Sequence, residues 1–213
     1  MNKLITAVIL LTISLSSYSS EEPEERLVFI GSQINFNEFD PNEESDGCDD
    51  VVVDTSNGEE GLMECITISL DAAFKATYSI SKVVEGSYLG DSISFEVYDH
   101  YGTPEFSKYD VAMIYLEKYD GKWYHEKYTW NKVYETVDGQ YADCSLDYVN
   151  EHLYEPGLLK PVKFKKVVNF DIRHYNSTLK NSFKSAPAFL SKGNLVTCQK
   201  GIYAKDLLAL ERG

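Results

Sequence analysis

The residues best suited to chemistry in this 213-residue chain are histidines that stand beside carboxylates. Asp99 and His100 are adjacent in the stretch FEVYDHYGTPEF, and His125 follows on a later segment. Imidazole and carboxylate groups bind zinc and its neighbours, so these three residues would form a metal site if the fold brought them together. Their spacing does not require this. Gly102 and Pro104 follow at once and are typical of turns, so we favour a turn that Asp99 closes by accepting backbone amides.

The motifs of the common enzyme classes are absent from the sequence. It contains no GxSxG elbow, no HExxH helix, no Walker loop and no GxGxxG loop. We therefore expect a binding or inhibitor-like module that uses no cofactor and is not an enzyme. A metal-dependent hydrolase built around Asp99, His100 and His125 is the alternative.

Aromatic side chains form the second kind of candidate site. The chain has 16 tyrosines, and five large aromatic residues fall within twelve positions: Trp123, Tyr124, Tyr128, Trp130 and Tyr134. In a regular strand the four even-numbered rings of this row would share one face. Such rows bind sugars or peptides by stacking, and they also serve as ordinary cross-strand packing pairs. A protein or a glycan is the partner that this row would suit.

The first 19 residues are predicted to be a secretory signal peptide. Lys3 is followed by an apolar run from Leu4 to Leu15 and then by small residues, with Ser17 and Ser19 before the expected cleavage point. The apolar run is shorter than the roughly 20 residues of a membrane-spanning helix. We therefore expect a secreted or periplasmic protein that is not inserted in the membrane.

The four cysteines all follow the predicted signal. An oxidising compartment favours two disulfides, and four cysteines allow three pairings. We favour Cys48 with Cys65 and Cys144 with Cys198, because the first pair would close a loop rich in glycine and acidic residues. No CxxC pair is present, so a zinc cluster is not expected.

The charge balance is strongly acidic. The formal net charge is −14, and the segment from Glu38 to Gly61 holds ten carboxylates without a Lys or Arg. We expect this segment to be a solvated loop, with a site for a cation or a basic partner as the alternative. An acidic surface repels phosphate backbones and anionic lipid, so neither nucleic acid nor a membrane surface is an expected partner.

Alternating apolar residues indicate that the chain is mostly β. Strands are expected over Leu27–Phe36, Ser92–Val97 and Val162–Ile172, and a hairpin is expected at Asp120–Gly121. In the first of these strands the residues predicted to share a face are Val28, Ile30, Ile34 and Phe36. In the stretch FKATYSISKVVEG the alternation slips at Lys82, which predicts a bulge.

Two short helices are also expected, over Ser145–Leu153 and near the C-terminus in YAKDLLALERG. The predicted architecture is an OB-like five-stranded barrel with additional C-terminal strands and one or two short helices. We expect the barrel to span residues 20–145, with residues 146–213 as a C-terminal extension (helix, strand, helix) packed on the same domain. The sequon at Asn176 would carry a glycan only in a glycosylating host.

Three stretches in this order carry a resemblance to a known family: LVFIGSQINF, FKATYSISKVVEGSYLGDSISFEV and YDVAMIYLEKYDGKWYH. Together they resemble the N-terminal domain of the tissue inhibitors of metalloproteinases and the netrin-like module, both OB-folds. The resemblance covers about residues 27–125 and implies a fold and no catalytic residues. In the inhibitors an N-terminal cysteine chelates the protease zinc. This chain has no cysteine before Cys48, so that mechanism is not expected.

Overall fold

The structure is a computed structural model that describes residues 22–41, 51–54, 60–63, 71–145 and 157–213. The predicted signal peptide, the proposed Cys48–Cys65 pair, most of the acidic segment 38–61 and nearly all of the helix expected at 145–153 lie outside these residues. No helix in the described ranges combines the length and the apolarity that a membrane span requires.

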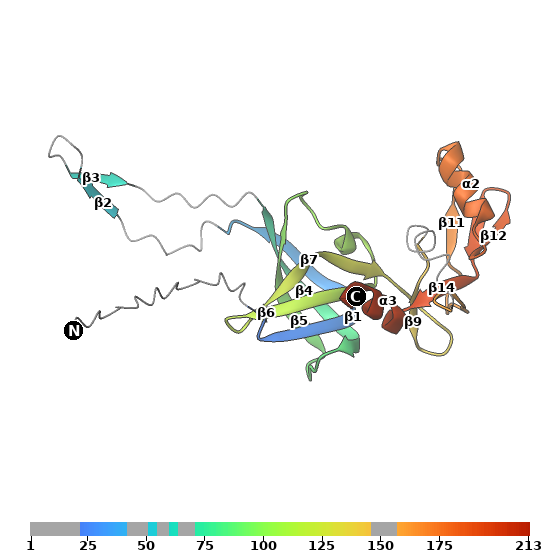
Figure 1. The fold of residues 1–213 in the computed structure, drawn as a ribbon, viewed down its shortest axis with the longest axis horizontal. Coiled ribbons are helices and arrows are strands. Elements are labelled where there is room, and N and C mark those ends of the chain that lie inside the picture. Colours follow the sequence, from blue (N-terminus) through green and yellow to red (C-terminus); the bar gives the residue numbers. More distant parts are fainter. Residues whose placement is uncertain (1–21, 42–50, 55–59, 64–70, 146–156) are drawn as a thin grey trace, which may run out of the picture.

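The larger part of the molecule is a closed five-stranded barrel, as the sequence predicted (Figure 1). Its strands are β1 (Glu25–Phe39), β4 (Ala72–Glu85), β5 (Ser92–Asp99), β6 (Ala112–Tyr119) and β7 (Lys122–Lys132). They pair in the order β1-β4-β5-β7-β6, with β6 returning to β1, and only the β5–β7 pair is parallel. Numbered within the barrel, this is the order 1-2-3-5-4 of an OB-like fold. The short strands β2 (Val51–Asp54) and β3 (Glu60–Met63) form a separate hairpin between β1 and β4.

Apolar side chains from all five strands fill the barrel. The core includes Phe29, Tyr78 and Phe95, whose rings meet edge to face or tilted at 5.6–6.4 Å. A short 3-10 helix, η1 (Glu105–Lys108), joins β5 to β6 and places Phe106 in this core with no exposed surface. The hairpin expected at Asp120–Gly121 is the β6–β7 turn, where both residues have positive φ.

The single face predicted for the first strand is wrong, because bulges change its alternation. Phe36 packs against the barrel core, whereas Val28 and Ile30 belong to a second cluster outside the barrel, and Ile34 is 61 % exposed. Pairing with β4 shifts at three places, and Ile34 is the unpaired residue at one of them. The slip predicted near Lys82 is confirmed as a second of these shifts, at which Ser81 of β4 has no partner on β1.

Beyond the barrel, the described residues 133–145 and 157–213 form two small sheets and two helices. One sheet contains β8 (Tyr134–Glu135), β9 (Tyr141–Asp143), β10 (Lys160–Pro161) and β14 (Lys200–Tyr203), and the other contains β11 (Asn169–Asp171), β12 (Phe189–Lys192) and β13 (Leu195–Cys198). The strand predicted over Val162–Ile172 is broken, with only β11 and an isolated bridge at Phe164 within it. The barrel strands end at Lys132. Strands β8 and β9, which were assigned to the barrel domain, belong instead to this C-terminal sheet, in which β9 pairs with both β8 and β14.

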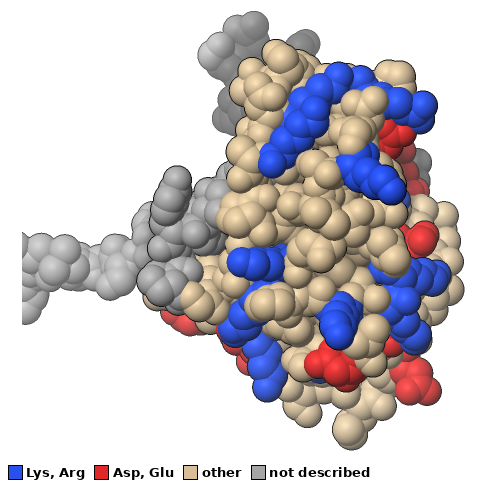
Figure 2. Space-filling view, turned by 90° about the vertical axis from the view of Figure 1, so that its right-hand side faces the viewer, with Lys and Arg blue, Asp and Glu red and all other residues tan. Residues whose placement is uncertain are grey.

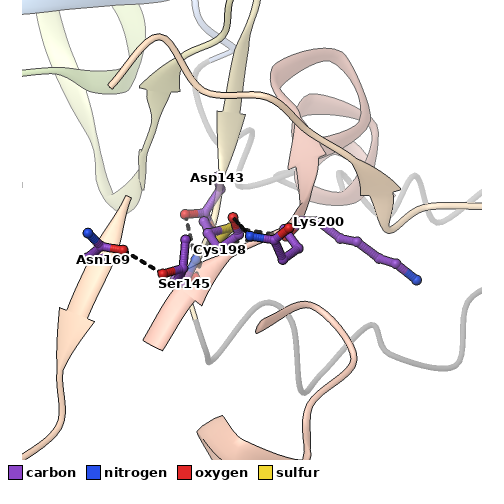
Figure 3. The surroundings of a disulfide bond; sticks show 8 residues. Asp143, Ser145, Asn169, Cys198 and Lys200 are labelled. Carbon is purple, nitrogen blue, oxygen red and sulfur yellow. Dashed lines mark hydrogen bonds between the residues drawn. A yellow bond between two sulfur atoms is a disulfide. The ribbon is translucent and has the colours of Figure 1, made fainter. Parts of the chain in front are cut away.

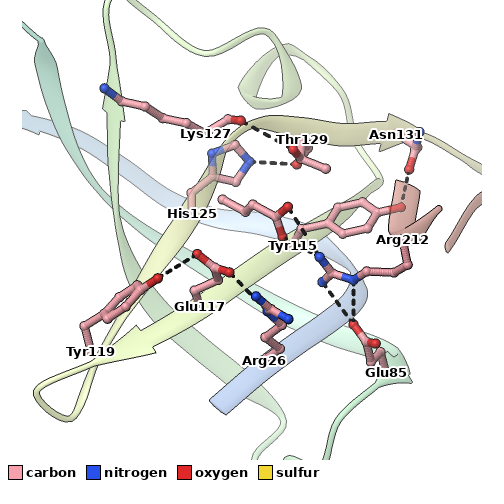
Figure 4. Close-up of polar contacts among 11 residues, drawn as sticks. Arg26, Glu85, Tyr115, Glu117, Tyr119, His125, Lys127, Thr129, Asn131 and Arg212 are labelled. Carbon is pink, nitrogen blue, oxygen red and sulfur yellow. Dashed lines mark hydrogen bonds and ion pairs between the residues drawn. The ribbon is translucent and has the colours of Figure 1, made fainter. Parts of the chain in front are cut away.

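The predicted C-terminal helix is α3 (Ala204–Arg212), and it covers the outer side of the barrel. Its Leu207 packs with Val28 and Ile30 from β1. Arg212 holds the end of the helix to two barrel strands, with ion pairs of 3.0 Å to Glu85 and to Glu126 (Figure 4). The C-terminal helix therefore joins the two parts of the molecule through apolar contacts and charge pairs.

A disulfide and a capped helix order the outer part of the C-terminal region. The predicted bond between Cys144 and Cys198 is present and ties the end of β9 to the end of β13 (Figure 3). The second helix, α2 (Ser177–Ser185), was not predicted. Asn176, noted only as part of a sequon, caps it by accepting a hydrogen bond of 2.9 Å from the backbone N–H of Leu179.

Candidate functional site

The Asp99–His100 stretch is a turn, as we favoured. The Asp99 carboxylate accepts a hydrogen bond of 2.8 Å from the backbone N–H of Tyr101, and Gly102 has a φ of 97°. This is the local side-chain bond that closes an Asx turn. The His100 ring lies at the surface, with Nδ1 3.3 Å from the carboxylate of Asp71.

His125 lies apart from this turn, inside the barrel. Its side chain is 8 % exposed, and its ring is 4.7 Å from that of Phe106. Nε2 lies 3.1 Å from the carbonyl oxygen of Thr129, and Nδ1 is a buried atom with no hydrogen-bond partner (Figure 4). In the described part of the chain, no three His, Cys, Asp or Glu side chains are grouped to hold a metal. The structure therefore does not bring Asp99, His100 and His125 together.

Burial of His125 predicts a pH dependence of stability. Burial lowers the pKa of His125 to about 4. Because the unfolded chain takes up this proton at about pH 6.5, the free energy of unfolding should fall as the pH drops from 6.5 towards 4, by up to about 3 kcal/mol. Urea unfolding of the wild type and of His125→Gln at about pH 7 and pH 4.5 tests this, since glutamine keeps an N–H donor but does not titrate.

The comparison with His125→Gln is needed because a second buried group has the opposite effect. Burial raises the pKa of Asp143 to about 6, so this carboxyl makes the fold more stable as the pH falls. Asp143 is present in both proteins, and its contribution cancels in the difference. An equal loss of stability on acidification in both proteins would contradict the prediction.

The four even-numbered rings of the predicted row do not share a face, and that part of the prediction is wrong. A bulge interrupts β7 between His125 and Trp130, and Tyr128 within it has a φ of 65°. As a result Trp123 and Trp130 pack against the barrel core, and Tyr128 is exposed. The two remaining rings point to different surroundings, since Tyr124 contacts Tyr98 and Tyr119 on the barrel while Tyr134 contacts Phe164 in the C-terminal part.

A cleft beside the barrel brings Tyr134 together with residues that the sequence analysis did not select. Its volume is about 580 Å³, which is within the range of natural ligand sites. Its lining comes from the end of η1, the end of β7, β8 and the segment after β10: Lys108, Tyr109, Asp110, Val111, Lys132, Val133, Tyr134, Glu135, Lys165 and Lys166. We call it the Lys132 cleft.

Lys132 gives the cleft its chemical character. Its ammonium group lies 4.1 Å from the ring centre of Tyr109 and 5.5 Å from that of Tyr134. Burial lowers the pKa of Lys132, and the charges of Asp143 and Glu105 only partly offset this effect. Within the described ranges Lys132 forms no ion pair. The side chain is therefore a partly desolvated cation, held between two aromatic rings, that an anion would stabilise.

Of the other three cations of the cleft, two form ion pairs with described residues and one does not. Lys165 is bound to the Glu135 carboxylate at 2.9 and 3.0 Å, and Lys108 is 3.8 Å from Glu105. Lys166 forms no ion pair with any residue that the structure describes, and it is exposed. Lys132 and Lys166 are consequently the two cations of the cleft that are available to a ligand.

The charge of the whole protein is divided unevenly along the chain, and this is the signal that the sequence analysis missed. Residues 157–213 contain eleven of the 20 Lys and Arg residues but three of the 34 Asp and Glu residues. The expectation that nucleic acid is not a partner stays a prediction, but the net charge of −14 no longer supports it by itself. A local count of charge would have pointed to the C-terminal part, although not to Lys132.

Comparisons with protein-family models, with curated proteins and with solved structures find no match to this chain.

Proposed function

We propose that this protein is a non-catalytic binding module that recognises an acidic group of a protein or glycan partner in the Lys132 cleft. The observation that supports this most directly is the state of Lys132, a partly buried ammonium between Tyr109 and Tyr134 with no ion pair among the described residues. A desolvated charge without a partner costs free energy, which a bound carboxylate, sulfate or phosphate would recover.

The tyrosine rings suit the remainder of such a ligand. Tyr109 stacks on Trp130 at 5.4 Å, and this fixes its ring at the edge of the cleft. A fixed aromatic ring offers an apolar face to a sugar ring or to the side chain of a peptide, while the neighbouring lysine binds the charge. Both classes of partner therefore remain within the proposal.

We place this binding module outside the cytoplasm. The disulfide between Cys144 and Cys198 is consistent with an oxidising compartment, and the predicted signal peptide supports export. The resemblance to the tissue inhibitors of metalloproteinases and netrin-like modules contributes one idea to the proposal, that the barrel serves as a binding scaffold. The contact itself would be made by the tyrosines and lysines of the cleft, and not by an N-terminal cysteine as in those inhibitors.

The test is a binding screen on matched pairs of ligands, in which each acidic oligosaccharide or peptide stands beside its neutral analogue. We expect the wild type to prefer acidic members, and Lys132→Met to weaken that binding by about tenfold or more, because methionine keeps the apolar stem but removes the charge. Lys122→Met is the matched control. Lys122 is an exposed lysine on the same strand, β7, but does not line the cleft, so its loss should change binding less than about threefold.

Two results of this screen would contradict the proposal. One is binding that Lys132→Met and Lys122→Met leave equally unchanged, which would place the contact elsewhere on the surface. The other is the absence of any acidic ligand that the wild type prefers to its neutral analogue.

A further inference from the structure

The cations of the C-terminal part extend beyond the Lys132 cleft. Four form ion pairs: Lys160 with Asp206 at 2.6 Å, Lys165 with Glu135, Arg173 with Asp171 at 2.6 Å, and Arg212 with Glu85 and Glu126. Seven lysines form no ion pair within the described ranges: Lys163, Lys166, Lys180, Lys184, Lys192, Lys200 and Lys205. We call these seven the C-terminal lysines.

Three of these lysines lie on elements at one end of the molecule, Lys180 and Lys184 on α2 and Lys192 on β12. In Figure 1 β11, α2 and β12 project together at one end, away from the barrel, whereas α3, which carries Lys205, lies against the barrel. Figure 2 looks at that end, where Lys and Arg side chains are spread over the surface and Asp and Glu side chains show mainly along its edge and lower part. A surface of this kind attracts polyanions although the protein as a whole is acidic.

We infer that the partner is a linear polyanionic glycan, a polysaccharide with uronate or sulfate groups, which lies in the Lys132 cleft and continues over the C-terminal lysines. This inference rests on the proposed function and names the class of its ligand. The connection between the two regions is Lys166, which lines the cleft and is also one of the C-terminal lysines. A short acidic ligand would use only the cleft, whereas a polymer gains further charge contacts along the surface.

The available side chains favour a glycan over nucleic acid. The seven cations of this region that form no ion pair within the described ranges are all lysines, while its two arginines, Arg173 and Arg212, are engaged with carboxylates. Arginine is the side chain that recognises phosphate and base edges in a bidentate manner. Three rings of this region, Phe170, Phe183 and Phe189, pack in the core and offer no platform on which bases stack, whereas Tyr175 is partly exposed.

The shape of the site favours a polymer chain over a membrane surface. Lys132 lies in a cleft and is partly buried, so a flat layer of lipid headgroups would not reach it. A chain of sugar rings can enter the cleft, place a charged group near Lys132 and stack against Tyr109.

The experiment measures the affinity of the full chain for polygalacturonate, a uronate polymer, with dextran as the neutral polymer. We expect binding of polygalacturonate only, with an affinity at least about tenfold higher than that of digalacturonate at about 50 mM salt, and a decrease as salt is raised. Charge reversals are then added in steps: Lys192→Glu, then Lys184→Glu, then Lys163→Glu. Each step should weaken polymer binding severalfold and reduce its dependence on salt.

The matched control for the first step is Lys122→Glu. Lys122 and Lys192 are both exposed lysines directly beside the glycine of a β-hairpin turn, Gly121 and Gly193, and each reversal changes the net charge equally. Lys122 differs in lying 3.7 Å from the carboxylate of Glu96, a surface ion pair that contributes little. Lys122→Glu should leave polymer binding within about threefold of the wild type. Far-UV circular dichroism shows that each variant is folded.

The outcomes separate this inference from the proposed function. Suppose that digalacturonate binds the wild type but not Lys132→Met, that the polymer binds no more tightly than digalacturonate, and that the C-terminal reversals have no effect. The inference is then wrong, while the proposed function stands. If the binding of neither ligand depends on Lys132, the inference and the proposed function are both wrong. Tighter binding of single-stranded oligothymidylate, poly-glutamate or anionic vesicles than of polygalacturonate, at equal charge concentration, would assign the surface to that class and overturn the glycan.

Discussion

Replacement of Phe106 by alanine is expected to lower the free energy of unfolding by about 3–5 kcal/mol, the range found when a buried aromatic side chain is removed. Phe106 has no exposed surface, although it stands in a four-residue 3-10 helix between two strands. Its ring contacts Phe36, Tyr78 and Trp130 from three barrel strands. Equilibrium unfolding in urea measures the loss.

The control for this prediction is Glu105→Ala in the same short helix. Glu105 is exposed and lies 3.8 Å from Lys108, an ion pair that contributes little at a surface. Its replacement should change the free energy of unfolding by less than about 0.5 kcal/mol. If Phe106→Ala cost no more than Glu105→Ala, the ring could not be the group that fills this end of the barrel core.

The second large effect concerns the disulfide. Replacing Cys144 and Cys198 together by alanine should destabilise the fold by about 2–4 kcal/mol. The bond joins residues 54 positions apart, so it removes a large loop entropy from the unfolded chain. Both cysteines are buried in the same cluster as Phe183 and Phe189, and we expect the C-terminal part to lose its order first.

A double variant is preferable to a reducing agent for this measurement, because a reductant would also act on any bond that Cys48 and Cys65 form. The signal to follow is near-UV circular dichroism during urea unfolding of the variant and the wild type. Identical unfolding midpoints would contradict a stabilising role for the bond.

The barrel was predictable because the burial of most of its strand residues follows the local pattern of apolar residues in the sequence. Residues Ile93, Phe95 and Val97 alternate inwards without interruption, and Ala112–Leu116 is apolar on both faces because the barrel core lies on one side and α3 on the other. The face of β1 was not predictable from alternation. The bulge at Ile34 reverses the phase of the strand, and its position depends on pairing with β4 rather than on the sequence of β1 alone.

The candidate site was less predictable than the fold. The row from Trp123 to Tyr134 has the spacing of a regular strand, but the bulge at Tyr128 separates its members. The Lys132 cleft draws its residues from segments that are distant in sequence, and neither Lys132 nor Tyr109 belongs to a motif. Only the tertiary fold reveals that a lysine at the end of a strand lies near two rings and forms no ion pair with the residues that the structure describes.

Folding is complete only when α3 has packed on β1, and these two elements are far apart in the sequence. Ile30 and Leu207 are in one cluster but about 180 residues apart in the sequence, and β1 also needs β6 to close the barrel. Contacts between such distant segments slow folding, because loop entropy is lost before they form. Until α3 arrives, a closed barrel would expose Val28, Ile30, Met113 and Tyr115 as an apolar strip. We therefore expect folding intermediates of this protein to be prone to aggregation.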